Sequence, residues 1–448
     1  MTLAEQYARF THGLTWQDLP EEVRGMAREL FADWLANAVA GYRSPLTQAL
    51  LAVVPASGSA VRIGDLHAAD PLAATLINAS AAHANEFDDS YRAGLYHPGA
   101  PVQAAAFSAA CLNGVSGSAM LTGIVAGYEI SLRLAAAINP AHYKVWHTTG
   151  TVGAFGAAAA AAHLLELTPE QTAAAFGLAG TQAAGLWEVL PDAPQAKNLH
   201  PAKAAHSGLL AALLAQRGIN GPASIFEGEQ GFFAATVPAE VDLSRCLAGL
   251  GEQWLTLDTT FKAYPVCGHT MTSIEAVLQL AAQVRAEEVE HIEVRAHPVS
   301  LQVAGETHPA DEAAAKFSIP WCVAVALSRG RVGLDEFTPS SLQDASIRAL
   351  LERIELVADD TLSRVPGQRP ARVSLRLKQG GTLSALAEVR KGDPERAMTA
   401  AEKHAKCIGL MTPYWGEKGA QAVMAAIDEL PGVSQLKHWA DGLRFLIV

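Results

Sequence analysis

Apolar residues recur with helical spacing through most of the first 257 residues, and polar residues fill the positions between them. Segments with this spacing end at Gly, Asn or Pro, and several begin at Thr-Pro or Ser-Pro, which are signals of helix ends and starts. No run of alternating β-branched residues interrupts them. The pattern predicts an all-α domain with helices over 21–42, 71–87, 101–114, 118–138, 151–167, 168–187 and 203–218.

The pattern changes after residue 258. Residues 290–298 alternate between polar and apolar, residues 353–360 are short and β-branched, and residues 371–392 indicate two strands joined by a Gly-Gly turn. Further helices are expected over 273–284, 312–327, 341–354, 395–411, 416–430 and 434–446. We therefore predict a mainly α protein, in which a large all-α helical domain (1–257 plus 394–448) carries an inserted, smaller α+β lid domain (258–393).

One apolar run is long enough to cross a membrane, because residues 148–167 contain no charge before Glu166. The run consists largely of Ala, Gly and Thr, whose transfer into lipid gains little free energy. We interpret it as a buried helix at the centre of the helical domain, where small side chains let neighbouring backbones approach closely. The concentration of alanine in the first 250 residues fits this packing, and no membrane partner is expected.

The composition of the chain indicates which kinds of partner it can bind and in which compartment it is expected. The formal net charge of −12 and the lack of a Lys/Arg stripe argue against nucleic-acid binding, which leaves small molecules and proteins as partners. The five cysteines lie far apart without a CxxC pair, so we expect reduced thiols in a cytoplasmic protein and no structural zinc. The N-terminus lacks the basic start and apolar stretch of a signal peptide.

Only 17% of the residues are charged, so four clusters of titratable residues at Gly- and Pro-rich turns stand out. The first cluster contains Glu86, Asp88, Asp89, Ser90 and His97. Acids at this density before a Gly/Pro loop could bind a metal, cap the next helix or hold a histidine. The alternative is N-capping by solvated acids. His97, framed by apolar helices, is a better functional candidate than Asp89.

The second cluster lies at the start of the long apolar helix and contains His142, Lys144, His147, Thr148 and Thr149. A helix N-terminus offers backbone N–H groups and a partial positive charge to an anion, and His147 could act there as an acid or base. The alternative is a capped helix start with an ordinary histidine.

The third cluster places Lys197, His200, Lys203 and His206 within ten residues, before an Ala/Leu-rich helix. Basic side chains at the mouth of a buried helix suit carboxylate binding, and burial can lower the pKa of a lysine enough for proton exchange. One of the two lysines is expected to be simply solvated.

The fourth cluster lies at the predicted domain junction and contains Lys262, Tyr264, Cys267 and His269. Cys267 could be a nucleophile, but a lone cysteine without a lowered pKa is more often structural. A site between the two domains is the default expectation for a protein of this organisation.

These clusters hold many His and Lys residues but no spacing of His, Cys and Asp that is typical of a metal site, and GTVGAFG lacks the preceding strand of a dinucleotide fold. We predict no metal and no cofactor. Removing a proton next to a carboxylate needs cations for the carboxylate, a base near neutral pKa and an acid for a leaving hydroxyl. The residues therefore favour a cofactor-free enzyme that acts on a polycarboxylate.

In their order along nearly the whole chain, these segments resemble the MmgE/PrpD family, which includes 2-methylcitrate dehydratase, cis-aconitate decarboxylase and iminodisuccinate epimerase. The resemblance is carried by residues 83–101, 127–135, 146–162, 176–186, 197–222, 261–270 and 315–327. It implies a helical domain built from both chain ends, an inserted α+β lid, an active site in the cleft between them, a homodimer and no metal.

Carried over by position, the resemblance assigns the active-site residues of the family to Glu86, Ser90, His97, His147, Lys197 and Lys262. Two of these positions, and a third one in the lid, depart from the family pattern. Glu86 and Ser90 stand where relatives often have Asp and Thr, and Trp321 replaces a lid tyrosine and so lacks its phenol donor. The decarboxylase branch has histidine at the position of Cys267, so the resemblance supports decarboxylation least.

The hypothesis is a lyase that reversibly removes water from a hydroxylated di- or tricarboxylate, as 2-methylcitrate dehydratase does. His97, His147 and Lys197 would supply the base and the acid, with Glu86 as a further catalytic residue, while Lys203 and Lys262 would neutralise carboxylates. The remaining predicted substrate-binding residues are Ser90, Thr148, His200, Tyr264, Cys267, His269 and Trp321.

The main alternative is epimerisation at a carbon next to a carboxylate, which needs two bases on opposite faces and no leaving group. Another is an all-α terpenoid-type lyase, because residues 85–91 resemble an acidic, magnesium-binding motif. That alternative requires a second acidic motif and an aromatic cage, and aromatic residues are only 6% of the chain. A non-enzymatic scaffold would not need four titratable clusters at Gly-rich turns.

Overall fold

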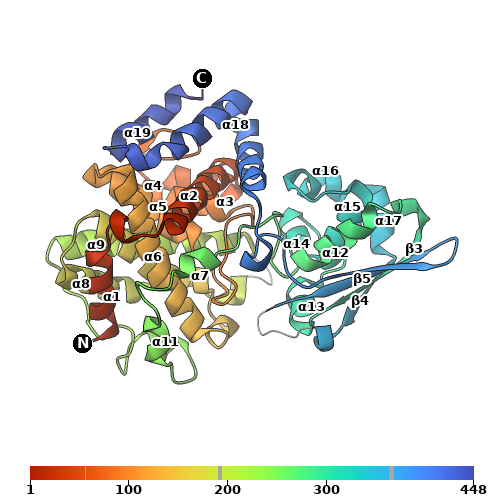
Figure 1. Cartoon of the computed structure of the whole chain (residues 1–448), viewed down its shortest axis with the longest axis horizontal. Helices are drawn as coiled ribbons and strands as arrows, with labels where there is room; N and C mark the ends of the chain where they lie inside the picture. Colours follow the sequence, from red (N-terminus) through yellow and green to blue (C-terminus); the bar gives the residue numbers. More distant parts are fainter. Residues whose placement is uncertain (56, 190–193, 363–367, 448) are drawn as a thin grey trace. The chain divides into compact units, whose positions relative to one another are not determined.

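The computed structural model describes residues 1–55, 57–189, 194–362 and 368–447, and these residues form two compact units (Figure 1). The first unit contains Met1–Ala84, Asp88–Thr260 and Thr399–Val448. The second contains Phe261–Met398 together with the three residues Asn85–Phe87, which the sequence patterns did not separate from the helical domain.

The first unit is almost entirely helical in its described part. Its helices are α1 (Leu3–Gly13), α2 (Glu21–Gly41), α3 (Pro45–Val53), α4 (Pro71–His83), α5 (Gly99–Asn113), α6 (Gly117–Ile138), α7 (Thr148–Leu164), α8 (Pro169–Gly180), α9 (Leu199–Gln216), α10 (Phe232–Thr236), α11 (Leu243–Leu247), α18 (Ala400–Asp428) and α19 (Leu436–Gly442). Two strands of two residues, β1 (Ala60–Val61) and β2 (Ala68–Ala69), pair antiparallel, which the helical pattern did not predict.

Helix α7 is the central helix of the first unit and packs against α5, α6, α8 and α9 (Figure 1). All of its residues except His163 are buried, so the prediction of a buried helix is confirmed. Its glycines make close packing feasible. A Cβ at Gly156 would lie 2.8 Å from the Ser131 side chain of α6, too close for two carbon atoms, so only glycine fits there without a shift.

Among the residues that the structure describes, one helix, α6, is long and apolar enough to cross a membrane by length and composition. Its most apolar window is 89% buried inside the protein, which is the pattern of a core helix in a globular domain. The run examined in the sequence, residues 148–167, is the buried helix α7 and the turn after it.

The second unit contains one four-stranded sheet in its described part, with the order β4-β3-β5-β6. Its elements are β3 (Val289–Ala296), β4 (Ile354–Ala358), β5 (Ala371–Leu377), β6 (Thr382–Ala387), α12 (Met271–Ala281), α13 (Pro298–Ala304), α14 (Glu312–Lys316), α15 (Ile319–Arg329), α16 (Pro339–Leu342) and α17 (Ala345–Leu351). Strands β3 and β4 run parallel, whereas the β3–β5 and β5–β6 pairs are antiparallel. Helix α12 packs on β5 and β6, and α15 packs on α12 (Figure 1).

Some predicted helices are interrupted or joined. The predicted helix over 312–327 is broken into α14 and α15 at Ser318, whose hydroxyl accepts the Trp321 N–H and caps α15. The helix over 341–354 is broken in the same way where Asp344 caps α17. The helices predicted over 395–411 and 416–430 are joined as α18, with a kink at Gly416, whose φ of 69° favours glycine.

None of the five cysteines, all of which lie in the described part of the chain, forms a disulfide, in agreement with the prediction of reduced thiols. All five are buried: Cys111, Cys246, Cys267, Cys322 and Cys407. Burial raises the pKa of the Cys111 thiol to about 12 and that of Cys246 to about 11. It raises the pKa values of Cys322 and Cys407 further still.

Candidate active site

Four histidines from four segments meet in the first unit, and we call them the histidine cluster: His83, His97, His147 and His200. His83 is the last residue of α4, and His97 lies just before α5. His147 is the N-cap of α7, and His200 lies in the first turn of α9. The ring centroids of His83 lie 5.0 Å from His97 and 6.0 Å from His147, and those of His147 and His200 are 5.3 Å apart.

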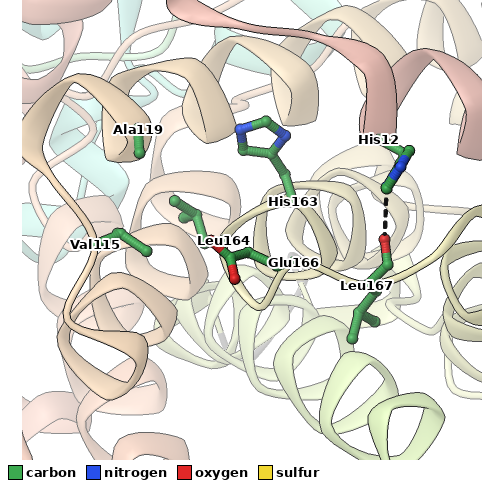
Figure 2. A pocket seen from close by; sticks show the side chains of 7 residues that line it. All are labelled: His12, Val115, Ala119, His163, Leu164, Glu166 and Leu167. Carbon is green, nitrogen blue, oxygen red and sulfur yellow. Dashed lines mark hydrogen bonds between the residues drawn. The ribbon is translucent and has the colours of Figure 1, made fainter.

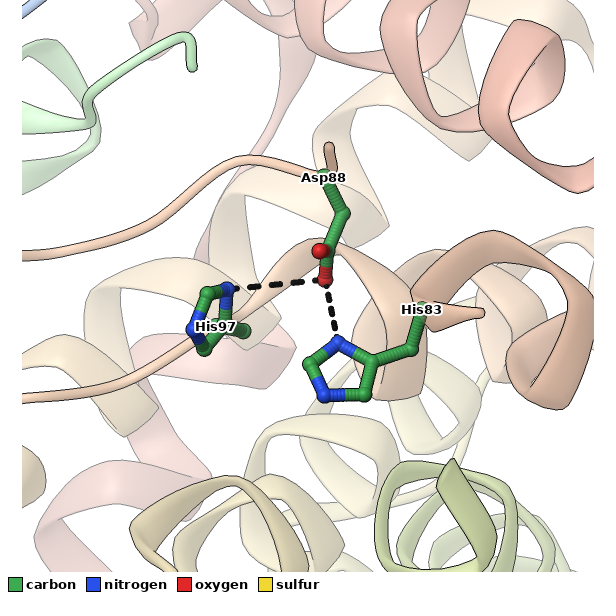
Figure 3. A group of neighbouring side chains, drawn as sticks. All are labelled: His83, Asp88 and His97. Carbon is green, nitrogen blue, oxygen red and sulfur yellow. Dashed lines mark hydrogen bonds and ion pairs between the residues drawn. The ribbon is translucent and has the colours of Figure 1, made fainter. Parts of the chain in front are cut away.

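Asp88 organises one side of the histidine cluster (Figure 3). Its Oδ2 lies 2.7 Å from Nδ1 of His83 and 3.6 Å from Nδ1 of His97. Nδ1 of His97 also lies 2.9 Å from the carbonyl oxygen of Asp89, which can only accept a hydrogen bond. His97 therefore carries its proton on Nδ1, and Nε2 is the basic atom of the neutral ring.

The other side of the cluster is the close pair His147 and His200. Their Nδ1 atoms lie 3.0 Å apart, so one ring donates and the other accepts. The approach depends on Gly150 of α7, since a Cβ at that position would lie 3.0 Å from Cβ of His200 and 2.5 Å from the carbonyl oxygen of Ala184. The glycine-rich sequence that follows His147 thus lets α9 bring His200 into the cluster.

The paired imidazoles are held neutral at physiological pH. Burial, followed by the charge of Lys197 and then by the neighbouring histidines, lowers the pKa of His147 well below its usual range. Burial, with His83 and Lys197, lowers the pKa of His200 to about 4. A neutral imidazole can accept a proton, and the low dielectric around it strengthens its interactions with a bound substrate.

Three further residues surround His147 and His97. Lys197, at the 3₁₀ helix Pro194–Asn198, is 4% exposed, although it carries a charge. The Trp187 ring lies 4.4 Å from that of His147. The backbone N–H of His97 donates to the Thr149 hydroxyl at 3.2 Å, which ties the His97 loop to the first turn of α7.

The remaining residues of the first sequence cluster have mixed surroundings. Asp89 accepts hydrogen bonds from the Tyr128 hydroxyl at 2.8 Å and from the Gly99 N–H at 3.0 Å. Burial, followed by the charge of Asp88, raises the pKa of Asp89 to about 8. The Ser90 hydroxyl is buried and has no hydrogen-bond partner among the described residues, so it can still bond to a ligand.

Glu86 and Lys262 form a buried ion pair in the second unit. Nζ of Lys262 donates to Oε2 of Glu86 at 3.2 Å and to the Glu86 carbonyl oxygen at 2.9 Å. Lys262 is 1% exposed. Nearby, Nζ of Lys316 donates to the carbonyl oxygen of Asn85 at 3.1 Å, and its own carbonyl accepts the Cys267 N–H.

The other predicted residues of the second unit are held by protein partners. The Tyr264 hydroxyl donates to Glu275, and Trp321 lies in the core, where its indole N–H donates to the Glu336 carbonyl at 3.3 Å. Burial, together with the charges of Arg369 and Arg390, lowers the pKa of His269 to about 3. Their roles in substrate binding stay predictions.

Two predicted substrate-binding residues of the first unit differ in exposure. Thr148 is buried in the first turn of α7, where its hydroxyl accepts from the Asn139 side chain at 3.2 Å. Lys203 is exposed on α9, and its Nζ donates to the Ser207 hydroxyl one turn later. The structure thus brings His97, His147 and His200 together, while Lys203 points to solvent.

His83, Asp88 and His97 each bring one potential ligand atom within 4.8 Å of one another, so they are a candidate for a metal ion. Both Nδ1 atoms, however, serve as hydrogen-bond donors, His83 to Asp88 and His97 to Asp89. A cation bound through these two Nδ1 atoms would have to displace both protons. The hydrogen bonds thus describe a proton-holding network, and the absence of a metal stays a prediction.

A small cavity of about 210 Å³ lies at the far end of α7, lined by His12, His163 and Glu166 among others (Figure 2). In it the His12 ring is hydrogen-bonded to the Leu167 carbonyl oxygen at 2.9 Å. Since α7 rises 1.5 Å per residue, His163 lies roughly 24 Å along the helix from His147. The cavity is therefore separate from the histidine cluster.

Models of two protein domains match this chain. The MmgE/PrpD N-terminal domain matches residues 5–243, and the MmgE/PrpD C-terminal domain matches residues 264–430. The chain belongs to the MmgE/PrpD family. This confirms the family resemblance of the sequence segments.

Curated relatives of this MmgE/PrpD protein have low identity but long coverage. A cis-aconitate decarboxylase-like protein, oryM of Aspergillus oryzae, is 27% identical over 84% of this chain and 84% of its own length. A cis-aconitate decarboxylase of Aspergillus terreus is 24% identical over 97% and 95%. The cis-aconitate decarboxylase of Homo sapiens is 25% identical over 79% and 76%.

The family and these relatives indicate an enzyme of the lyase type that acts on a carboxylic acid. They do not favour the hydro-lyase in particular, because the relatives are named as decarboxylases. The homodimer and the cytoplasmic location stay predictions.

The histidine cluster of this MmgE/PrpD protein predicts a pH dependence of stability. An unfolded histidine titrates near 6.5, whereas the folded pKa of His200 is about 4. Between these values the unfolded chain binds the proton and the folded chain does not, so the stabilising contribution of His200 is complete above pH 6.5 and is lost as the pH falls to 4.

The measurement is urea unfolding of the wild type and of His200→Gln at pH 7.5, 6.0 and 5.0. The quantity compared is the difference in unfolding free energy between the two proteins. Asp89, whose folded pKa is raised, shifts the stability of both proteins in the opposite direction, and the difference removes this shared effect. The stability of the wild type relative to the variant should decrease steadily with falling pH. A difference that is constant with pH would contradict the neutral, buried state of His200.

Proposed function

We propose that this protein is a lyase that removes a proton from the carbon next to a carboxylate of a di- or tricarboxylate and expels a β-hydroxyl group as water. The base takes the C–H proton, the electron pair of that bond forms the new C=C bond, and the hydroxide leaves with a proton from an acid. The reverse reaction adds water across the same double bond.

The observation that carries the proposal is the histidine cluster with its assigned proton positions. His97 has its proton on Nδ1 through the Asp89 carbonyl, which leaves Nε2 as the basic atom. Asp88 lies 3.6 Å from the protonated nitrogen and would stabilise the imidazolium that forms. His147 and His200 share one hydrogen bond and stay neutral, so they provide a second group that can exchange a proton.

Cations support carboxylate binding in this proposal. Lys197 lies near enough to His147 and His200 to lower the pKa values of both, and it would neutralise a substrate carboxylate in the first unit. It could alternatively donate the proton to the leaving hydroxide. In the second unit, Lys262, the ion-pair partner of Glu86, stays a predicted carboxylate-binding residue.

Decarboxylation is the second candidate, because the relatives reported above are cis-aconitate decarboxylases or resemble them. It would use the same bases and acids, but the C–C bond to a carboxylate breaks and a proton is added to the carbon. By the family resemblance, Cys267 stands where the decarboxylase branch has histidine, which speaks against decarboxylation in this chain. Epimerisation remains the third candidate.

Proton NMR in D₂O with a panel of hydroxylated and unsaturated di- and tricarboxylates separates the three reactions. A dehydratase should give an alkene signal from a hydroxy acid and deuterium next to the carboxylate in the reverse direction. A decarboxylase should release CO₂ and place deuterium on the product carbon. Deuterium entry without an alkene signal or CO₂ release would contradict the lyase and support the epimerase.

A further inference from the structure

Two buried lysines hold one short strap of backbone in the second unit. The strap is Asn85–Phe87, and it separates α4 from Asp88 along the chain. Nζ of Lys316 donates to the Asn85 carbonyl oxygen, and Nζ of Lys262 donates to the next carbonyl oxygen, that of Glu86. The two ammonium groups therefore bind neighbouring peptide units, although they come from sequence positions 54 residues apart.

The backbone of the strap is strained at Glu86, the residue between the Asn85 carbonyl and the Lys262 ammonium contacts. Glu86 has a φ of 55°, in the left-handed region that non-glycine residues rarely adopt. Such conformations persist only where the surroundings enforce them, and they concentrate at functional sites. Here the strain turns the Glu86 carbonyl and side chain toward the same ammonium group, that of Lys262.

Lys316 forms no ion pair within the part of the chain that the structure describes. Lys262 is paired with the Glu86 carboxylate, but the one hydrogen-bond acceptor of Lys316 Nζ there is the neutral Asn85 carbonyl. Lys316 is only 8% exposed, and a buried ammonium with a single neutral acceptor is costly. An ammonium has three donors, and two of those of Lys316 have no acceptor among the described residues.

We propose that Lys316 is a carboxylate-binding residue of the second unit, which holds one carboxylate of a di- or tricarboxylate substrate through the two donors that the protein leaves open. The proposal rests on the proposed function, since it names a further residue for the same class of substrate. The sequence patterns passed over Lys316 because it lies in an alanine-rich segment predicted as helix.

The surroundings of Lys316 also make its affinity for anions sensitive to pH. Burial lowers its pKa to about 8, with Glu86 and Glu312 acting to raise it and Lys262 to lower it. The ammonium is therefore the form that binds below about pH 8, and a carboxylate that binds to it should raise its pKa. Affinity is expected to fall as the pH rises above this value.

The test measures binding without turnover, by isothermal titration of the full-length protein with citrate as the tricarboxylate probe and with chloride as the anion control. Lys316→Met should weaken citrate binding roughly ten- to a hundredfold, which is the effect of losing charged hydrogen bonds. Lys316→Arg keeps the charge and should restore part of the affinity. Lys378→Met, which removes an exposed lysine on the same unit, should bind citrate as the wild type does.

Each result decides one of two questions. Equal citrate affinity in the wild type, Lys316→Met and Lys316→Arg overturns the carboxylate-binding role and leaves the proposed reaction standing. A wild type that binds no carboxylate and turns over none of the NMR panel overturns both. Circular dichroism shows whether Lys316→Met is folded. If it is not, the citrate affinities of Lys316→Arg and of the wild type are compared from pH 7 to 9. Arginine stays charged in this range, so the variant should not lose affinity above pH 8 as the wild type does, and an equal loss in both proteins would overturn the proposal.

Discussion

Replacing His147 with glutamine should lower kcat by about 10²- to 10⁴-fold, which is the usual range for the loss of a general acid or base. Glutamine can keep a hydrogen bond to His200, but it cannot take up a proton, so the exchange of protons in the histidine cluster is interrupted. The reaction found by NMR supplies the assay. Melting by circular dichroism should change by only a few degrees, because the side chain keeps its approximate volume and its polar contact.

The matched control for this variant is His163→Gln. His163 lies on the same helix, and its Nδ1 donates to the Thr11 carbonyl at 2.9 Å, but it stands at the opposite end of α7 from the histidine cluster. Its replacement should leave kcat within about twofold, since a group this far from the reacting atoms does not touch them. If His147→Gln kept wild-type activity, the assignment of the site to the histidine cluster would be wrong.

Removing the carboxylate of Glu129 should destabilise the protein by about 3–5 kcal/mol, the cost of leaving a buried charge without its partner. Glu129 and Arg133 face each other one turn apart on α6 and are 0% and 1% exposed. The Glu129 carboxylate also accepts the N–H and the hydroxyl of Thr256. In Glu129→Ala the guanidinium of Arg133 therefore stays buried without its carboxylate partner, and the N–H and hydroxyl of Thr256 lose their acceptor.

The measurement is urea unfolding followed by tryptophan fluorescence. The control is Asp441→Ala, which breaks the pair with Lys437. This pair also has i,i+4 spacing, but its side chains are 29% and 41% exposed, so the loss should cost about 1 kcal/mol or less. The double variant Glu129→Leu/Arg133→Leu removes both charges and should recover part of the loss. A Glu129→Ala protein as stable as Asp441→Ala would show that this ion pair contributes little.

Part of the histidine cluster could be predicted from sequence, because titratable residues are locally dense around two of its members. His97 lies in a Gly/Pro turn, and His147 lies at a helix start rich in Thr and Gly, where polar groups are unusual for this chain. His83 was passed over since it ends the apolar helix α4 and looks like a core residue in that context. Only the fold brings it to Asp88, five residues later, and to His97.

In the sheet, too, local features could be predicted from the sequence and long-range contacts could not. The turn between β5 and β6 was predicted from its Gly-Gly pair, and both glycines have the positive φ of 90° that such a turn requires. β3 pairs with β4 in parallel and with β5 across 75 or more residues, and these long-range pairings have no local sequence signal of the kind that marks a tight turn. Lys316 belongs to the same class, because its burial depends on contacts with a strap more than 200 residues away.

The buried cysteines make this protein convenient for site-specific labelling. Maleimides react with the thiolate form, and all five sulfhydryls are shielded from solvent, while burial also raises the pKa of Cys111 and Cys246, so these thiols should react slowly. A cysteine introduced at an exposed position, such as Lys378 or Lys203, would then be the fastest-reacting thiol in the native protein. Fluorophores or spin labels can thus be attached to either unit without first removing the five natural cysteines.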